Sequence, residues 1–121
     1  MAQPTALIIE DDEKLADIFS LTLQSADFIT EIVSDGALAM ARLEEVIPNV
    51  VILDLHLPHV SGPEILRMIL ATESLAHTKV IVTTADDRLA DTMRGKAHLV
   101  LLKPVSPEQL RQLAQRLLPT A

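Results

Sequence analysis

Val50-Val51-Ile52-Leu53-Asp54 is the stretch of this 121-residue chain that decides its fold. Four consecutive apolar residues end at a carboxylate, and a short unbroken apolar run is typical of a strand buried on both faces of a parallel sheet. Ala6-Leu7-Ile8-Ile9 has the same form and ends at Glu10 and Asp11. We therefore predict two buried strands whose carboxyl ends carry acidic side chains.

Strand and helix patterns alternate along the whole chain. Strands are predicted over residues 6–9, 28–33, 50–53, 80–82 and 99–102, the second of them at an edge because Thr30 and Glu31 interrupt it. Helical patterns follow them around residues 15–23, 35–46, 65–69, 86–94 and 106–118. Asp35 and Ser106 are predicted to cap the second and the last of these helices. Five such repeats predict one α/β domain over residues 1–121, a flavodoxin-like doubly wound (βα)5 fold with a five-stranded parallel sheet in the order 2-1-3-4-5.

The composition restricts the classes of function. Hydrophobic residues make up 49% of the chain and the formal net charge is −7. A nucleic-acid-binding domain needs a basic patch to neutralise phosphates, so we predict no direct nucleic-acid partner. The absence of cysteine favours a reducing compartment, the apolar runs are too short to span a membrane, and no signal peptide is visible. We therefore predict a cytoplasmic protein without a membrane partner.

Chemically active side chains stand where the predicted strands end. Glu10 and Asp11 follow the first strand, Asp54 the third, Thr84 the fourth and Lys103 the fifth. In a doubly wound sheet, ligands bind at the carboxyl ends of the strands, where the chain changes direction. Oxygen-rich sites of this kind suit Mg²⁺, and Mn²⁺ could take its place. A carboxylate nucleophile, a cation, a hydroxyl and an ammonium are the parts needed for phosphoryl transfer to an aspartate.

The same residues carry a family resemblance that covers essentially the whole chain. Glu10-Asp11, Asp54-Leu55-His56-Leu57-Pro58 followed by Gly62, Thr84-Ala85 and Lys103-Pro104 together resemble response regulator receiver domains of two-component systems. This resemblance implies that Asp54 is the phosphoacceptor and that Thr84 and Lys103 contact the phosphoryl group. It also implies a cis peptide bond before Pro104.

The resemblance further implies the surroundings of the phosphoacceptor. Glu10, Asp11 and Asp54 would hold the metal ion together with the main-chain carbonyl of His56. The small side chain of Ala85 would leave room for the phosphoryl oxygens.

The resemblance also implies partners. The phosphoryl group would come from a histidine kinase or a histidine phosphotransfer protein, and phosphorylation would change contacts with a downstream effector or within a homodimer. The chain would catalyse its own phosphorylation and dephosphorylation without acting as an enzyme on a separate substrate.

Three departures from the family concern signalling. Val100 stands where many receivers carry an aromatic residue, and Val105 where Phe is common. The segment between Thr84 and Lys103 is shorter than usual, and Gly95 interrupts it early, which predicts a short fourth helix. A degenerate receiver that binds a partner constitutively is therefore an alternative.

The residues around Asp54 allow two further hypotheses about the chemistry of the site. A small aspartate-nucleophile phosphatase would need a second acid near Asp54, where this chain has His56. His56 and His59 could together form a transition-metal site, but histidines of a solvent-exposed loop are the simpler interpretation.

Overall fold

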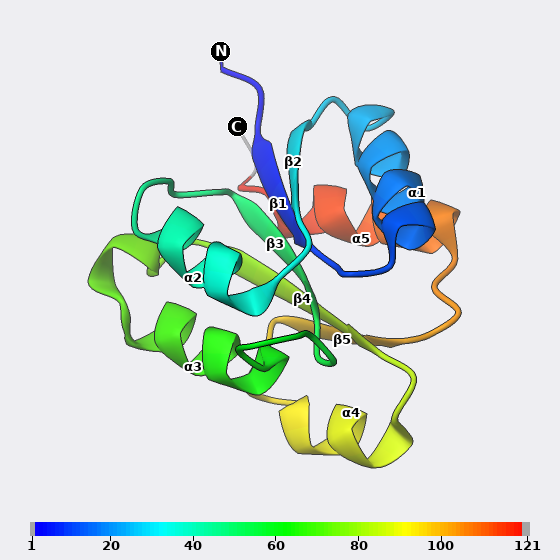
Figure 1. The fold of residues 1–121 in the computed structure, drawn as a ribbon. Coiled ribbons are helices and arrows are strands. Elements are labelled where there is room, and N and C mark those ends of the chain that lie inside the picture. The colour runs from blue at the N-terminus through cyan, green and yellow to red at the C-terminus, as the bar shows by residue number, and fades with distance from the viewer. Residues whose placement is uncertain (1, 120–121) are drawn as a thin grey trace.

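The computed structural model describes residues 2–119 as a five-stranded parallel sheet in the order β2-β1-β3-β4-β5 (Figure 1). This order confirms the predicted doubly wound fold. Each strand contributes four to six residues: β1 Thr5–Ile9, β2 Ile29–Val33, β3 Val50–Asp54, β4 Lys79–Thr84 and β5 Leu99–Leu102.

Helices cover both faces of the sheet (Figure 1). One face carries α1 and α5, which bound one apolar cluster with residues of the central strands, and the other carries α2, α3 and α4 over a second cluster. The bounds are α1 Glu13–Gln24, α2 Gly36–Leu43, α3 Gly62–Ala71, α4 Asp87–Met93 and α5 Pro107–Leu117, with a short 3-10 helix at Glu73–Leu75. This layering is the reason why β3, in the middle of the sheet, is apolar until its last residue.

The edge position predicted for β2 is confirmed, since Thr30 is half-buried and Glu31 is exposed. The Thr30 hydroxyl lies 2.7 Å from that of Ser20 on α1. The polar side chain of Thr30 therefore has a hydrogen-bond partner within the protein.

Side-chain caps begin the helices. Asp35 accepts hydrogen bonds from two backbone N–H groups of α2, and Ser106 accepts one from Gln109 at the start of α5, as their positions predicted. The second helix was expected to reach about residue 46, but α2 ends at Leu43. The backbone N–H groups of Glu44 and Glu45 donate to the carbonyls three residues before them, as in a 3-10 helix. The helix therefore ends shortly before Pro48.

The fourth helix is short, as predicted, with seven residues. Gly95 follows it with a φ of +85°, a conformation in which side chains other than hydrogen are strained. Among residues 2–119, no helix combines the length and the apolar character that crossing a bilayer would require.

Candidate functional site

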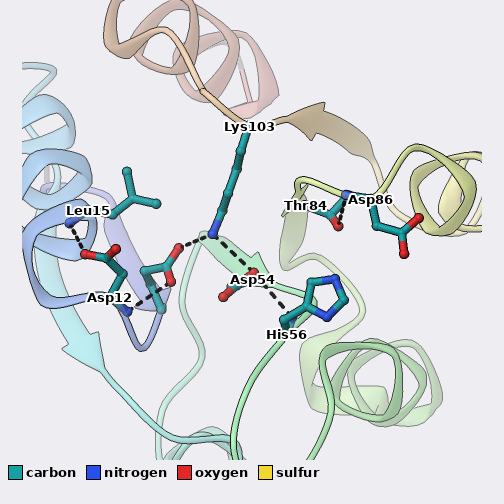
Figure 2. Close-up of polar contacts among 8 residues, drawn as sticks. Asp12, Leu15, Asp54, His56, Thr84, Asp86 and Lys103 are labelled. Carbon is teal, nitrogen blue, oxygen red and sulfur yellow. Dashed lines mark hydrogen bonds and ion pairs between the residues drawn. The ribbon is translucent and has the colours of Figure 1, made fainter.

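Three charged side chains from three strands meet at the carboxyl edge of the sheet (Figure 2). Glu10 follows β1, Asp54 is the last residue of β3, and Lys103 follows β5. The Lys103 ammonium nitrogen lies 2.9 Å from Glu10 Oε1 and 3.4 Å from Asp54 Oδ1. The parallel pairing of β1 with β3 places the carboxylates of Glu10 and Asp54 side by side. Lys103 reaches both of them from the end of the edge strand β5.

Glu10, Asp11 and Asp54 form an acidic cluster, in which one oxygen of each carboxylate lies within 4.8 Å of the others. Glu10 is 1% and Asp54 3% exposed, whereas Asp11 is open to solvent. Like charges about 4 Å apart repel by roughly 4 kcal/mol at an effective dielectric constant near ~20. One lysine cannot balance three carboxylates, and an oxygen-only donor set with an open side fits a hard divalent cation such as Mg²⁺.

The pKa values of Glu10 and Lys103 depend on their burial and on their contact with each other. Burial raises the pKa of Glu10 to about 7, although the hydrogen bonds from Lys103 and from the Asp12 N–H act in the opposite direction. Burial also opposes the charge of Lys103, but its contacts with Glu10 and Asp54 outweigh burial, so its pKa is raised above the ordinary value. The ammonium is therefore a permanent charge of the site, and the charge of Glu10 is the one that burial makes costly.

Thr84, at the end of β4, is fully buried, and its hydroxyl oxygen accepts a hydrogen bond from the Asp86 N–H at 3.0 Å (Figure 2). Within the described part of the chain, this hydroxyl forms no hydrogen bond with Asp54 or Lys103. Because the Thr84 oxygen acts as the acceptor, its hydrogen remains available to a ligand. Ala85 follows it directly and is exposed.

The backbone of His56 borders the carboxylate of Asp54. Its N–H donates to Asp54 Oδ1 at 3.3 Å, while its side chain is exposed. The other loop histidine, His59, contacts Asp35 at the start of α2 through Nδ1. Over residues 2–119, the acidic cluster is the only group of three or more side chains found suitable for holding a metal, so the geometry does not support a histidine site.

Sequence reasoning missed two supporting contacts. The N–H of Asp12 donates to Glu10 Oε2 at 3.2 Å, while the Asp12 carboxylate caps α1 at the Leu15 N–H, 3.1 Å away (Figure 2). Asp86 holds Thr84 and also caps α4. An aspartate directly before a helix signals a cap, but it does not identify the contacts that the backbone N–H groups of Asp12 and Asp86 make with Glu10 and Thr84.

This chain is similar in sequence or in structure to several characterised proteins. The DNA-binding response regulator MtrA of Mycobacterium tuberculosis is 29% identical over 107 residues, which are 86% of this chain and 46% of that protein. The transcriptional regulatory protein TrcR of the same organism is 34% identical over 107 residues, 86% of this chain and 41% of its own length. The chemotaxis response regulator CheY4 of Vibrio cholerae superposes with a TM-score of 0.87 at 25% identity, covering 97% of this chain and all of that one.

The comparisons correct one prediction. An absence of direct nucleic-acid binding was expected from the net charge, but relatives such as MtrA are named DNA-binding response regulators, so this prediction is wrong for the group. The prediction rested on the net charge of −7, which describes these 121 residues alone. The chain spans about half the length of the curated relatives it matches, and the charge argument does not reach the remainder of those proteins.

The match to a family model is nearly as long as the chain. The model of the response regulator receiver domain matches residues 6–115, from β1 to the last turns of α5. This range includes the acidic cluster and Lys103. The fold, the relatives and the model agree, and the chain belongs to the family of response regulator receiver domains.

Proposed function

We propose that Asp54 accepts a phosphoryl group from a phosphohistidine of a histidine kinase or phosphotransfer protein, and that this modification changes contacts with a downstream effector. The observation that carries the proposal is the Lys103 ammonium, held 2.9 Å from Glu10 and 3.4 Å from the carboxylate of Asp54. Membership in the receiver family supports the same role. A homodimer, a single domain over residues 1–121 and a cytoplasmic location stay predictions.

Asp54, Lys103 and Thr84 would each have a different role in the phosphoryl transfer. A carboxylate oxygen of Asp54 attacks phosphorus, the bond from phosphorus to the donor imidazole nitrogen breaks, and that nitrogen takes a proton from solvent. Lys103 lies where its charge would neutralise the incoming phosphoryl oxygens. The hydroxyl of Thr84, which is oriented by Asp86, keeps a hydrogen to donate to one of these oxygens.

Glu10, Asp11 and Asp54, with the main-chain carbonyl of His56, would hold a divalent cation, either Mg²⁺ or Mn²⁺. The oxygen-only cluster of carboxylates supports this assignment. Such an ion, when bound, neutralises charge on the transferring group.

A phosphorylation assay tests the proposal. Incubation of the chain with acetyl phosphate and Mg²⁺ should increase the intact mass by one phosphoryl group, and removal of Mg²⁺ by EDTA should prevent this. The Asp54→Asn variant should show no increase. Asp12→Asn is the matched control and should still be phosphorylated, because asparagine caps a helix as well as aspartate does and Asp12 binds the Leu15 N–H. No increase in the wild type, or an equal increase in Asp54→Asn, would refute the proposal.

A constitutive interaction module is the second candidate function, and the surroundings of Val100 favour it. Val100 is half-buried against the apolar cluster below α4, and it stands where many receivers carry an aromatic residue. Binding of an effector that stays the same after phosphorylation of Asp54 would support this second function. A phosphorylation-dependent change in binding would support the first.

A further inference from the structure

A hollow lies between α3 and the end of α4. These two helices cover the face of the sheet opposite to α1 and α5 (Figure 1). We call this hollow the α3–α4 groove, and it has a volume of about 210 Å³. Its lining consists of Pro63, Leu66, Arg67, Leu70, Met93 and Lys96. Leu66 and Met93 are buried at its floor, whereas Leu70 remains 54% exposed. The groove therefore offers an apolar surface that the domain itself does not cover.

The short fourth helix ends beside this groove. α4 has seven residues and packs on β4 and β5. Gly95 then turns the chain away with a φ of +85°, and a Cβ at this position would meet no other atom within 4 Å. Met93, the last residue of α4, and Lys96 both line the groove, so the helix ends at its rim.

Two basic side chains flank the apolar floor. Arg67 extends from α3 and Lys96 from the segment after α4, and both are exposed. Within residues 2–119, neither forms an ion pair, so both charges are free to interact with a ligand. The lining of the groove holds these two cations and no acidic side chain, in a chain with a formal charge of −7. Their charge is complementary to a ligand that carries carboxylates on both sides of an apolar group.

We propose that the α3–α4 groove binds an acidic peptide segment of a partner protein, with one apolar side chain placed between carboxylates. The volume suits a single large aliphatic or aromatic anchor, which would cover Leu70 and the exposed part of the floor. Arg67 would hold one carboxylate with its planar guanidinium, and Lys96 would attract the other. This inference does not depend on phosphoryl transfer to Asp54.

Binding of a designed probe tests the proposal. The probe is an acetylated peptide with one leucine between two pairs of glutamates, and binding is followed by amide chemical shifts of the ¹⁵N-labelled chain. We expect shifts that saturate with peptide concentration and cluster on α3 and on the residues that follow α4. The double variant Arg67→Glu, Lys96→Glu should weaken binding at least tenfold, and Leu70→Ala should weaken it severalfold.

Two controls distinguish specific binding in the α3–α4 groove from nonspecific electrostatic attraction. Arg116→Glu reverses an exposed helical charge on α5 and should leave the affinity within twofold of the wild type. A peptide with asparagine in place of leucine should lose the shifts at Leu70 and Met93. The proposal would be overturned by shifts elsewhere on the surface, by an equal effect of Arg116→Glu, or by anionic phospholipid vesicles binding through Arg67 and Lys96 when the peptide does not.

Discussion

Thr83 is a buried side chain whose hydroxyl has no hydrogen-bond partner among the described residues. It is 0% exposed and lies on β4 directly opposite Asp54 in the register of β3. Thr78 offers a comparison, since it is 2% exposed but donates to the Pro48 carbonyl at 2.8 Å. Burying a hydroxyl without a partner costs free energy, whereas a paired hydroxyl contributes to stability.

The two threonines should respond to the same substitution with opposite signs. Thr83→Val should raise the free energy of unfolding by about 1 kcal/mol, because it removes an unsatisfied hydroxyl at nearly constant volume. Thr78→Val should lower it by about 1–2 kcal/mol, because it leaves the Pro48 carbonyl unpaired. Urea unfolding monitored by circular dichroism measures both. Equal destabilisation by the two variants would show that the Thr83 hydroxyl is satisfied.

His98 is a second residue whose environment decides its chemistry. Its Nδ1 accepts a hydrogen bond from the Val80 N–H at 3.0 Å, which requires the neutral ring. Burial and, to a lesser extent, the charge of Lys79 lower the pKa of His98 below its ordinary value.

This lowered pKa predicts a loss of stability in mild acid. Above pH ~6.5 the ring is neutral in both the folded and the unfolded chain, and its hydrogen bond contributes fully. As the pH falls below that value, the unfolded chain binds the proton more readily, so stability is lost towards the folded pKa. His98→Asn keeps an acceptor near the Nδ1 position without titrating, and should lose less stability than the wild type between pH 7 and 5. His77→Asn should follow the wild type, because the described residues show no hydrogen bond to the His77 ring.

At the scale of elements, the connection from β3 to α3 holds the site by close packing. A Cβ on Gly62, the first residue of α3, would lie 2.5 Å from Leu55 Cα and 2.6 Å from the Asp54 carbonyl oxygen. The Gly62 N–H also donates to the Leu55 carbonyl at 3.2 Å. The helix therefore begins in contact with the backbone that carries Asp54, and only glycine allows this approach.

Gly62→Ala should therefore destabilise the fold by about 2–3 kcal/mol and slow phosphorylation of Asp54, since backbone atoms must move apart. Gly95→Ala is the comparison: its side chain would meet open space, and its left-handed conformation should cost only about 1–2 kcal/mol without an effect on phosphorylation. Thermal unfolding and the acetyl phosphate assay measure the two effects. A Gly62→Ala variant that is phosphorylated as fast as the wild type would contradict this account.

At the scale of the whole molecule, the proposed binding of a cation to the acidic cluster would stabilise the entire fold. A cation that binds only the folded chain should raise the free energy of unfolding by about 2.7 kcal/mol at a hundredfold excess over its dissociation constant. We expect Mg²⁺ to raise the melting temperature, and Asp11→Asn to reduce the rise, since Asp11 belongs to the cluster. Asp12→Asn should keep it. A rise that an equal ionic strength of NaCl reproduces would point to general screening instead.

Much of this molecule follows from local patterns in the chain. The apolar runs before Glu10 and Asp54 predicted the central strands, because a strand buried on both faces must be apolar throughout. Strong caps such as Ser106 predicted where helices begin. The end of α2 was less predictable, because a tightened last turn leaves little trace in composition.

The sequence by itself determined the alternation of strands and helices, and therefore which side chains stand at the carboxyl edge of the sheet. Only the tertiary structure decided that Lys103 pairs with Glu10 as well as Asp54, that burial raises the pKa of Glu10, and that a groove remains beside Leu70. The physical reason is that secondary structure depends on neighbours along the chain. Ion pairs, desolvation and surface shape depend instead on distances in space, here between residues 93 positions apart.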